Sequence, residues 1–127
     1  MASYRIYLVD DDRFLLDMYA VKFKAAGHDV TAFQSGQAAL DAIRKDPAPD
    51  ALLLDIVMPE IDGFGVLEAV RKENLIPTTK VIVLSNQGQE SDIEQATKLG
   101  VAGYIIKASA IPSEVFAETI SIIEKKS

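Results

Sequence analysis

The chain of 127 residues contains no cysteine. This absence excludes disulfide bonds, thiolate metal sites and cysteine nucleophiles, and it fits a reducing compartment. No apolar run approaches the ~20 residues that a membrane helix needs. Residues 1–4 are also too few and too polar to form a signal peptide. We therefore expect a cytoplasmic protein without a membrane segment.

Positive charge is scarce. The chain has 13 Lys and Arg against 19 Asp and Glu, which gives a formal net charge of -6. Proteins that bind nucleic acid directly group basic residues on one face to contact phosphates. We therefore expect no direct nucleic-acid ligand, and a DNA-binding role would require another chain.

Glycine and proline are few and scattered, with 7 and 5 residues, and no internal repeat or linker interrupts the chain. An apolar share of 49% is sufficient for one continuous core at this length. We expect residues 1–127 to form a single domain.

Five short apolar runs alternate with longer stretches of helical spacing. The runs cover residues 6–9, 30–33, 51–54, 81–84 and 104–106. Each run is almost continuously apolar, which is typical of strands that helices cover on both faces. The sequence therefore predicts an α/β domain of five βα units with a parallel sheet.

Several residues indicate where helices begin and end. We expect helix starts at the acidic triplet 10–12, at Ser35, at Asp62, at a capping box of Ser91 and Glu94, and near Pro112. Helix ends are expected at Gly27 and Gly100, because glycine tolerates the left-handed conformation there. The single histidine, His28, follows Gly27, and we expect it to lie in a solvated loop.

Polar residues follow four of the five predicted strands. They are Asp10 and Asp11 after the first, Asp55 after the third, Ser85 and Asn86 after the fourth, and Lys107 after the fifth. Each has an ordinary explanation when taken alone, as an acid at a helix start or a solvated loop residue. Ligands of open parallel sheets bind beyond the carboxyl ends of the strands, so their common placement favours a functional site.

The acidic residues of this group point to a particular chemistry. Crowded carboxylates resist ionisation unless positive charge lies among them, and a divalent cation supplies it. A few hard oxygen ligands with open positions suit Mg2+ and an incoming phosphoryl group. The site is therefore predicted to carry out phosphoryl chemistry.

An ordered set of residues closely resembles the receiver domain of two-component response regulators. The set is Asp10-Asp11, Asp55, Met58-Pro59, Asp62-Gly63, Ser85, Tyr104 and Lys107. The resemblance covers almost the whole chain. It implies a doubly wound, flavodoxin-like (βα)5 fold with helices on both faces of a sheet of order 2-1-3-4-5.

The resemblance also implies the roles of the acids. Asp55 would be the phospho-acceptor, taking a phosphoryl group from a sensor histidine kinase or phosphotransfer protein. Asp11, Asp55 and the main-chain carbonyl of Val57 would bind Mg2+, with Asp10 acting through a metal-bound water. The chain would catalyse only its own phosphorylation and dephosphorylation, so we do not expect an enzyme acting on other substrates.

The remaining roles concern the switch. Ser85 and Lys107 would bind phosphoryl oxygens, with the Asn86 N–H as a second donor beside Ser85. Tyr104 would then turn inward and change the face formed by the fourth helix, the fifth strand and the helix from Pro112. A downstream effector protein or output domain would bind this face, and a homodimer could form through it.

Two positions depart from the family pattern. Asn86 stands where a small residue is usual, and we expect it to alter the access of water to the phosphoryl group or the inward path of Tyr104. Ala108 stands where receivers usually have a proline joined to the lysine through a cis bond. Because a cis bond to alanine costs about 3–4 kcal/mol, we expect a trans bond between Lys107 and Ala108.

Three other functions fit the sequence less well. A pseudo-receiver would be a protein-binding module that works without phosphorylation, but all the functional positions are present. A flavodoxin-like cofactor protein would need a phosphate-binding loop after the first strand, where three aspartates would repel anions. A phosphatase of the haloacid-dehalogenase type would need a second Asp where Val57 stands.

Overall fold

A computed structural model of the chain describes residues 3–46, 49–86, 89–107 and 111–125. The strands are β1 (Arg5–Val9), β2 (Asp29–Phe33), β3 (Ala51–Leu54), β4 (Lys80–Ser85) and β5 (Gly103–Ile106). The helices are α1 (Arg13–Ala25), α2 (Gly36–Lys45), α3 (Gly63–Lys72), α4 (Glu90–Lys98) and α5 (Pro112–Glu124). Each of the five apolar runs is confirmed as a strand.

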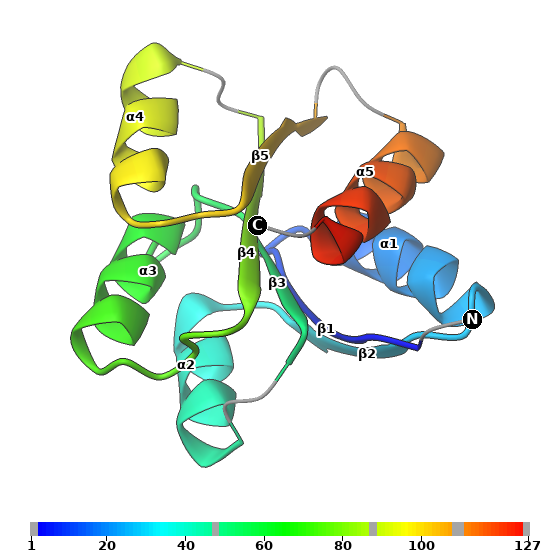
Figure 1. Cartoon of the computed structure of the whole chain (residues 1–127), viewed down its shortest axis with the longest axis horizontal. Helices are drawn as coiled ribbons and strands as arrows, with labels where there is room; N and C mark the ends of the chain where they lie inside the picture. Colours follow the sequence, from blue (N-terminus) through cyan, green and yellow to red (C-terminus); the bar gives the residue numbers. More distant parts are fainter. Residues whose placement is uncertain (1–2, 47–48, 87–88, 108–110, 126–127) are drawn as a thin grey trace.

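The strands form one parallel sheet of order β2-β1-β3-β4-β5. Helices α1 and α5 lie on one side of this sheet, and α2, α3 and α4 lie on the other (Figure 1). This arrangement confirms the doubly wound, flavodoxin-like fold with helices on both faces.

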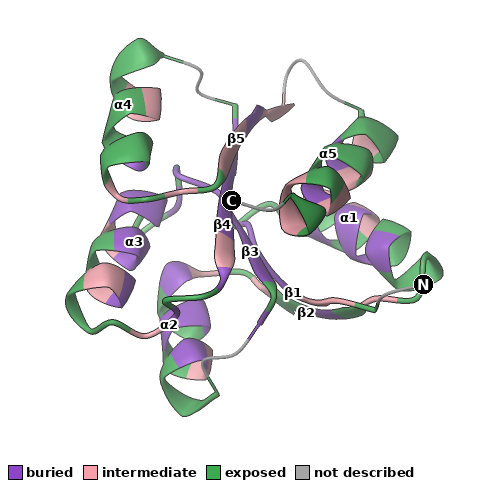
Figure 2. Ribbon diagram, in the orientation of Figure 1, coloured by how far each residue is buried: buried purple, intermediate pink, exposed green. Residues whose placement is uncertain are grey.

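Side chains along the strands alternate between two apolar cores. Figure 2 shows β3, in the middle of the sheet, as buried. Strand residues of the core beneath α1 and α5 are Ile6, Leu8, Val30, Ala51, Leu53, Ile82, Leu84 and Ile105. Those of the core beneath α2, α3 and α4 are Tyr7, Val9, Leu52, Leu54, Val81 and Val83, with Tyr104 packed against them. Burial on both sides explains why the runs are continuously apolar in sequence.

Most predicted helix ends are confirmed. The side chains of Asp12, Ser35 and Asp62 accept hydrogen bonds from backbone N–H groups of the first turns of α1, α2 and α3. Gly27 and Gly100 have φ values of 92° and 81° just beyond the ends of α1 and α4, a conformation that disfavours other residues. Pro112 is the first residue of α5.

The capping box predicted at Ser91 and Glu94 is wrong. Helix α4 begins two residues earlier than that box requires, with Gln89 as its N-cap, and the Gln89 side chain makes no capping hydrogen bond. The Gln89 carbonyl already accepts from the backbone N–H groups of Asp92 and Ile93. Ser91 therefore lies inside the first turn, where its hydroxyl cannot act as the cap.

His28 lies in the loop between α1 and β2 as expected, but its side chain is not fully solvated. His28 is half-buried, and its Nδ1 accepts a hydrogen bond from the Tyr4 backbone N–H at 3.1 Å. Its ring stacks on the Tyr4 ring with centroids 5.4 Å apart and lies 6.1 Å from the Phe116 ring. The histidine thus joins the start of β1 to the turn before β2 and to α5.

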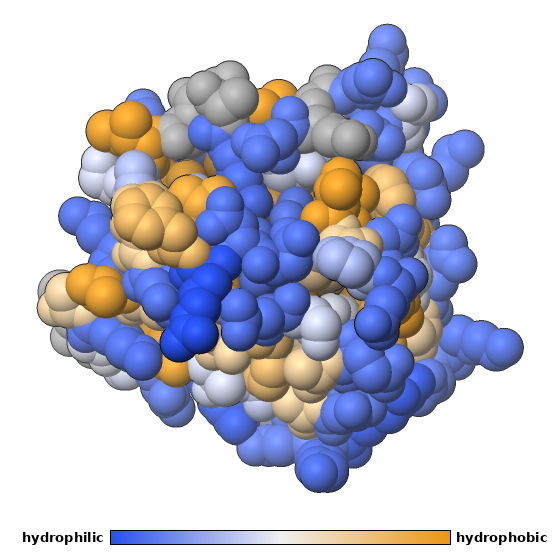
Figure 3. All heavy atoms as spheres, turned by 180° about the vertical axis from the view of Figure 1, so that it is seen from behind, coloured by the Kyte–Doolittle hydropathy of each residue, from blue (hydrophilic) through white to orange (hydrophobic). Residues whose placement is uncertain are grey.

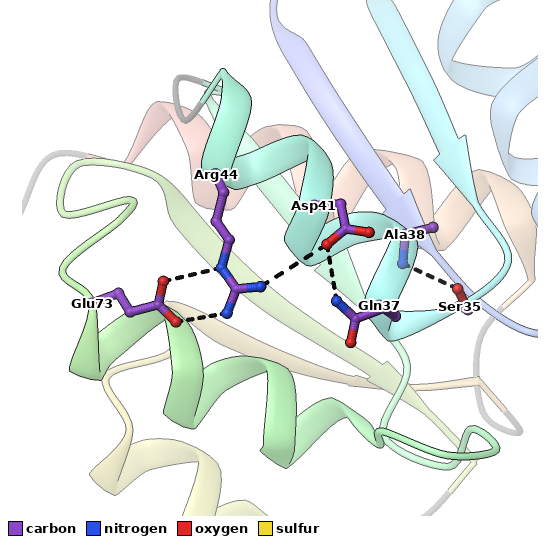
Figure 4. A network of polar contacts seen from close by, with 6 residues as sticks. All are labelled: Ser35, Gln37, Ala38, Asp41, Arg44 and Glu73. Carbon is purple, nitrogen blue, oxygen red and sulfur yellow. Dashed lines mark hydrogen bonds and ion pairs between the residues drawn. The ribbon is translucent and has the colours of Figure 1, made fainter.

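Helices α2 and α3 are joined by a polar network (Figure 4). Arg44 donates from Nε and Nη2 to the two carboxylate oxygens of Glu73, at 3.0 and 2.7 Å. Asp41 lies 3.9 Å from the Arg44 guanidinium and accepts from Gln37 at 2.9 Å. Because these side chains are partly exposed, solvent screens the charges of the pair, and it adds little to the stability of the fold.

The face seen in Figure 3 is mainly hydrophilic. On the face seen in Figure 3, apolar side chains form separate patches among hydrophilic ones. Across the described part of the chain, no helix has the length and apolar character needed to cross a bilayer.

Candidate functional site

The backbone places two of the predicted acids side by side. The Asp10 N–H donates to the Phe33 carbonyl at 3.1 Å, and the Asp55 N–H donates to the Val9 carbonyl at 2.9 Å. These bonds extend the ladders one residue beyond β1 and β3, so the alternation of side chains continues. The Asp10 and Asp55 side chains therefore lie next to each other on the face that α1 and α5 cover.

Three carboxylates meet at this edge of the sheet. One carboxylate oxygen from each of Asp10, Asp11 and Asp55 lies within 4.8 Å of the others. Asp10 and Asp55 are only 3% and 7% exposed, whereas Asp11 is exposed. Asp10 is also fixed by the Asp12 N–H, which donates to its Oδ1 at 2.9 Å. The structure thus brings together the three acids that the sequence singled out.

Lys107 supplies positive charge to this cluster. Its Nζ lies 2.5 Å from Asp10 Oδ2 and 3.5 Å from Asp55 Oδ2, with the lysine side chain only 6% exposed. Burial alone would lower the pKa of Lys107, but the hydrogen bond to Asp10 and the negative charges of Asp55 and Asp10 raise it. The ammonium is therefore charged at neutral pH.

Burial is the main influence on the acid at the end of β3. It raises the pKa of Asp55 to about 6, with the charges of Asp10 and Asp11 acting in the same direction and Lys107 opposing them. A carboxylate that resists ionisation gains most from additional positive charge. A cation beside Asp55 would therefore stabilise its ionised carboxylate.

The acids line the floor of a pocket that is open to solvent. Its lining residues are Asp10, Asp11, Asp12, Leu15, Asp55, Val57, Ser85, Asn86 and Lys107. All residues predicted to hold the metal or phosphoryl group are among them. Leu15 was not predicted, although its position one turn after Asp12 could have indicated it.

Ser85 and Tyr104 lie on the opposite face of the sheet from Asp55. Ser85 is completely buried at the end of β4, and Tyr104 is half-buried on β5. Burial raises the pKa of the Tyr104 hydroxyl, the Asp92 carboxylate raises it further, and a hydrogen bond with the Ser85 side chain lowers it. The two predicted switch residues are therefore in contact.

Gly63 supports the site in a way that sequence reasoning missed. Its N–H donates to the Ile56 carbonyl at 2.8 Å, so the start of α3 touches the chain that leaves β3. A Cβ atom at this position would collide with the Asp55 carbonyl oxygen and lie 2.8 Å from the Ile56 Cα. Only glycine allows this close approach, which explains the Asp62-Gly63 pair.

The donor set fits a divalent cation. Three carboxylates and one ammonium leave a net charge of minus two, which a divalent ion would neutralise. Carboxylate oxygens in an open pocket suit Mg2+, which keeps several waters and binds through one or two protein carboxylates. The prediction that the Val57 carbonyl is a ligand stays a prediction.

The expected trans bond between Lys107 and Ala108 lies outside the described residues, because Ala108 is not among them.

Comparison with known proteins agrees with this geometry. The five-stranded sheet and the acidic pocket at its carboxyl edge agree with the resemblance to response regulator receivers found in the sequence. The family model described as the response regulator receiver domain matches residues 6–116, so the chain belongs to that family.

Curated relatives are longer than this chain. It is 29% identical over 125 residues to the probable transcriptional regulator ycf27 of Porphyridium aerugineum, covering 98% of this chain and 50% of that protein. It is 32% identical over 105 residues to the regulatory protein VanRc of Enterococcus gallinarum, covering 83% and 44%. The chain therefore spans about half the length of the curated relatives it matches.

Solved structures show the same fold. The Francisella response regulator 1452 receiver domain is 26% identical with a TM-score of 0.85, and the alignment covers 96% of this chain and 98% of that one. The Vibrio cholerae chemotaxis protein CheY4 is 22% identical with a TM-score of 0.86, covering 95% and 99%.

The raised pKa of Asp55 leads to a prediction about stability. Because the folded pKa of about 6 lies above the ordinary value of 3.8, ionising Asp55 costs stability as the pH rises from about 4 to 6. Without Mg2+, Asp55→Asn should therefore raise the free energy of unfolding at pH 7.5 by roughly 1–3 kcal/mol, and by little near pH 4.

Urea unfolding at both pH values measures this difference. Glu118→Gln, a change at an exposed acid on α5, serves as the matched control and should have little effect. A gain for Asp55→Asn that is as large at pH 4 as at pH 7.5 would contradict the electrostatic explanation.

Proposed function

We propose that this chain is a phospho-accepting signal receiver in which Asp55 takes a phosphoryl group from a phosphohistidine. The donor would be a sensor histidine kinase or a phosphotransfer protein. The main support is the position of Asp55, a buried carboxylate with a raised pKa between Lys107 and two further acids that suit Mg2+.

The transfer exchanges one bond for another. An Asp55 carboxylate oxygen attacks phosphorus, a P–O bond forms, and the P–N bond to histidine breaks with its electron pair passing to the imidazole nitrogen. The product is an acyl phosphate. Water later attacks phosphorus, the bond to Asp55 breaks, and inorganic phosphate leaves. The chain would thus catalyse only its own phosphorylation and dephosphorylation.

The surrounding residues would reduce charge repulsion in this reaction. Mg2+, held by Asp11 and Asp55 with Asp10 acting through water, would offset the negative charge of the attacking carboxylate and the phosphoryl group. Lys107 already lies 3.5 Å from Asp55 and would bind a phosphoryl oxygen. The Ser85 hydroxyl and the Asn86 N–H would donate to others.

Phosphorylation would change the contact between Ser85 and Tyr104. The phosphoryl group adds about 1.5 to 2 negative charges and three acceptor oxygens, which would draw the Ser85 hydroxyl towards it. Tyr104 would follow and remodel the α4-β5-α5 face. A downstream effector or an output domain would bind there, and an output domain agrees with the greater length of the relatives. Dimerisation through this face stays a prediction.

Exposed apolar residues that lie close in sequence to the pocket residues support docking of the phosphodonor protein. Phe14, Val57 and Ile111 are 75%, 54% and 61% exposed. Phe14 belongs to the first turn of α1, Val57 follows Asp55, and Ile111 is the N-cap of α5. Apolar residues near an acidic pocket give a partner helix a surface to bury.

Intact mass after incubation with acetyl phosphate and Mg2+ tests the proposed acceptor. Wild type should gain the mass of one phosphoryl group, and Asp55→Asn should gain none, because an amide is not a nucleophile here. A chelator should abolish the gain. No gain in wild type would favour a pseudo-receiver, and an equal gain in both proteins would reject Asp55.

Asn86 should influence how long the acyl phosphate lasts. Asn86 is exposed, lines the pocket and is larger than the small residue usual in the family, so it would limit access of water. Asn86→Ala should raise the rate of phosphate release by severalfold without changing the site of phosphorylation. The decay of the phosphorylated mass at constant Mg2+ measures it, and an unchanged rate would refute this role.

Phe14 should matter only when the phosphodonor is a protein. Phe14→Ser should slow transfer from any sensor kinase that phosphorylates wild type, since an exposed apolar contact is lost. Its phosphorylation by acetyl phosphate should be unchanged. Val21→Ser, at an exposed residue further along α1, is the matched control. Equal slowing with both phosphodonors would point to damage of the site itself.

A further inference from the structure

A second pocket, the α3–α4 pocket, lies between the chain that follows β3, the start of α3 and the first turns of α4. It measures about 390 Å3, which is within the usual range of ligand pockets. Its lining residues are Ile56, Val57, Met58, Asp62, Phe64, Asp92 and Gln95. Val57 also lines the acidic pocket at Asp55, so the two pockets are neighbours.

The charge of the α3–α4 pocket has one sign. The described residues that line it include two acids, Asp62 and Asp92, and no Lys, Arg or His. Asp62 Oδ1 already accepts a hydrogen bond from the Gly65 N–H at 2.8 Å, as the cap of α3. The remaining walls are four apolar side chains and the amide of Gln95. A complementary ligand therefore carries a positive charge and an apolar part.

Asp92 has an oxygen for which the fold supplies no donor. It lies in the first turn of α4, and its Oδ2 is buried without a hydrogen-bond partner among the described residues. A buried carboxylate oxygen in this state is unfavourable. The terminal torsion of an aspartate side chain is soft, so a rotation of the carboxylate can turn either oxygen towards the pocket that the residue lines. A cationic donor in the pocket would offset this cost.

An arginine side chain suits these walls better than a lysine side chain. A guanidinium is planar and weakly hydrated, and it can donate two parallel N–H groups to one carboxylate. It also stacks on aromatic rings, and Phe64 offers one in this pocket. Its methylene groups can cover an apolar wall such as Met58. The compact, strongly hydrated ammonium of lysine gains less from apolar surroundings.

The rim of the α3–α4 pocket indicates that the arginine belongs to a protein. Val57 is 54% exposed, and Asp62 and Gln95 are exposed as well. An exposed apolar residue beside polar ones gives the main chain and neighbouring side chains of a partner a surface to cover. Arginine is enriched in such interfaces and often contributes much of their binding energy.

We propose that the α3–α4 pocket receives an arginine side chain of a partner protein, with the guanidinium bound to Asp92 and its plane against Phe64. The bound arginine would join α4 to the chain that follows β3, because both line the pocket. The partner would lie beside the acidic pocket, since Val57 belongs to both. This role goes beyond the proposed function, because it requires no phosphoryl group on Asp55.

N-acetyl-arginine amide is a probe for this pocket, and N-acetyl-citrulline amide is its matched control, because citrulline has nearly the same shape without the charge. In isotope-labelled wild type, the arginine compound should shift the backbone amide resonances of Met58, Phe64 and Gln95 until the site is saturated. The citrulline compound should bind at least about fivefold more weakly. Equal binding of the two compounds, no binding of either, or shifts confined to other residues would overturn the proposal.

Variants of the lining residues assign the contacts. Asp92→Asn should weaken binding of the arginine compound about fivefold. Glu94→Gln, at an exposed acid of the same helix that does not line the pocket, should bind like wild type. Phe64→Leu keeps an apolar side chain without an aromatic face and should weaken binding about twofold to fivefold.

A variant with an added charge keeps the test decisive if Asp92→Asn does not fold. Gln95→Glu places a further carboxylate on the exposed rim and should strengthen binding of the arginine compound about twofold or more. Unchanged binding in Asp92→Asn overturns the role of Asp92. If that variant does not fold, unchanged binding in Gln95→Glu overturns the role of the pocket.

Propylguanidinium distinguishes a small cation from the side chain of a partner. It has the guanidinium and alkyl chain of arginine without the peptide groups, so it should bind more weakly than N-acetyl-arginine amide. Equal or tighter binding would assign the pocket to a small cation and reject a partner protein as the occupant. None of these measurements needs Mg2+ or a phosphodonor, so their failure would leave the proposed function of Asp55 untouched.

Discussion

The site depends on the register of parallel strands and on the alternation of side chains along them. Val9 and Leu54 are paired in the sheet, so the residues that follow them, Asp10 and Asp55, lie side by side. Both side chains share the face of Leu8 and Leu53. A shift of one residue in either strand would turn one carboxylate to the other face. The buried apolar residues of β1 and β3 therefore fix the separation of the acids.

The same acids work against the stability of the fold. Two nearly buried carboxylates with a third close by repel one another, and the Lys107 ammonium offsets only part of this charge. The repulsion among the carboxylates does not reach the two apolar cores, because the acids lie at the edge of the sheet, where the pocket is open to water and ions. A site that needs a cation for balance is also one that responds to changes in charge, which suits a switch.

Much of this arrangement could be predicted from sequence because strand ends and helix caps are local features. Asp12, Ser35 and Asp62 cap their helices through bonds to residues three positions away, and continuous apolar runs indicate two-sided burial. The start of α4 could not be predicted, since the Gln89 carbonyl fixes it and Ser91 gives a misleading signal. The partial burial of His28 could not be predicted, because its partners, Tyr4 and Phe116, come from distant parts of the chain.

The two faces of the sheet explain how an event at Asp55 could reach α4. Asp55 and Lys107 belong to the face of α1 and α5, whereas Ser85 and Tyr104 follow the alternation of the face of α2, α3 and α4. Ser85 is completely buried where β4 ends. It lines the pocket and also contacts Tyr104. The Ser85 hydroxyl has one hydrogen to donate, so donating it to a new acceptor would alter its bond with Tyr104. Tightly packed groups change between discrete arrangements. A new set of oxygens at Asp55 would therefore act on the far side of the sheet through one side chain at a strand end.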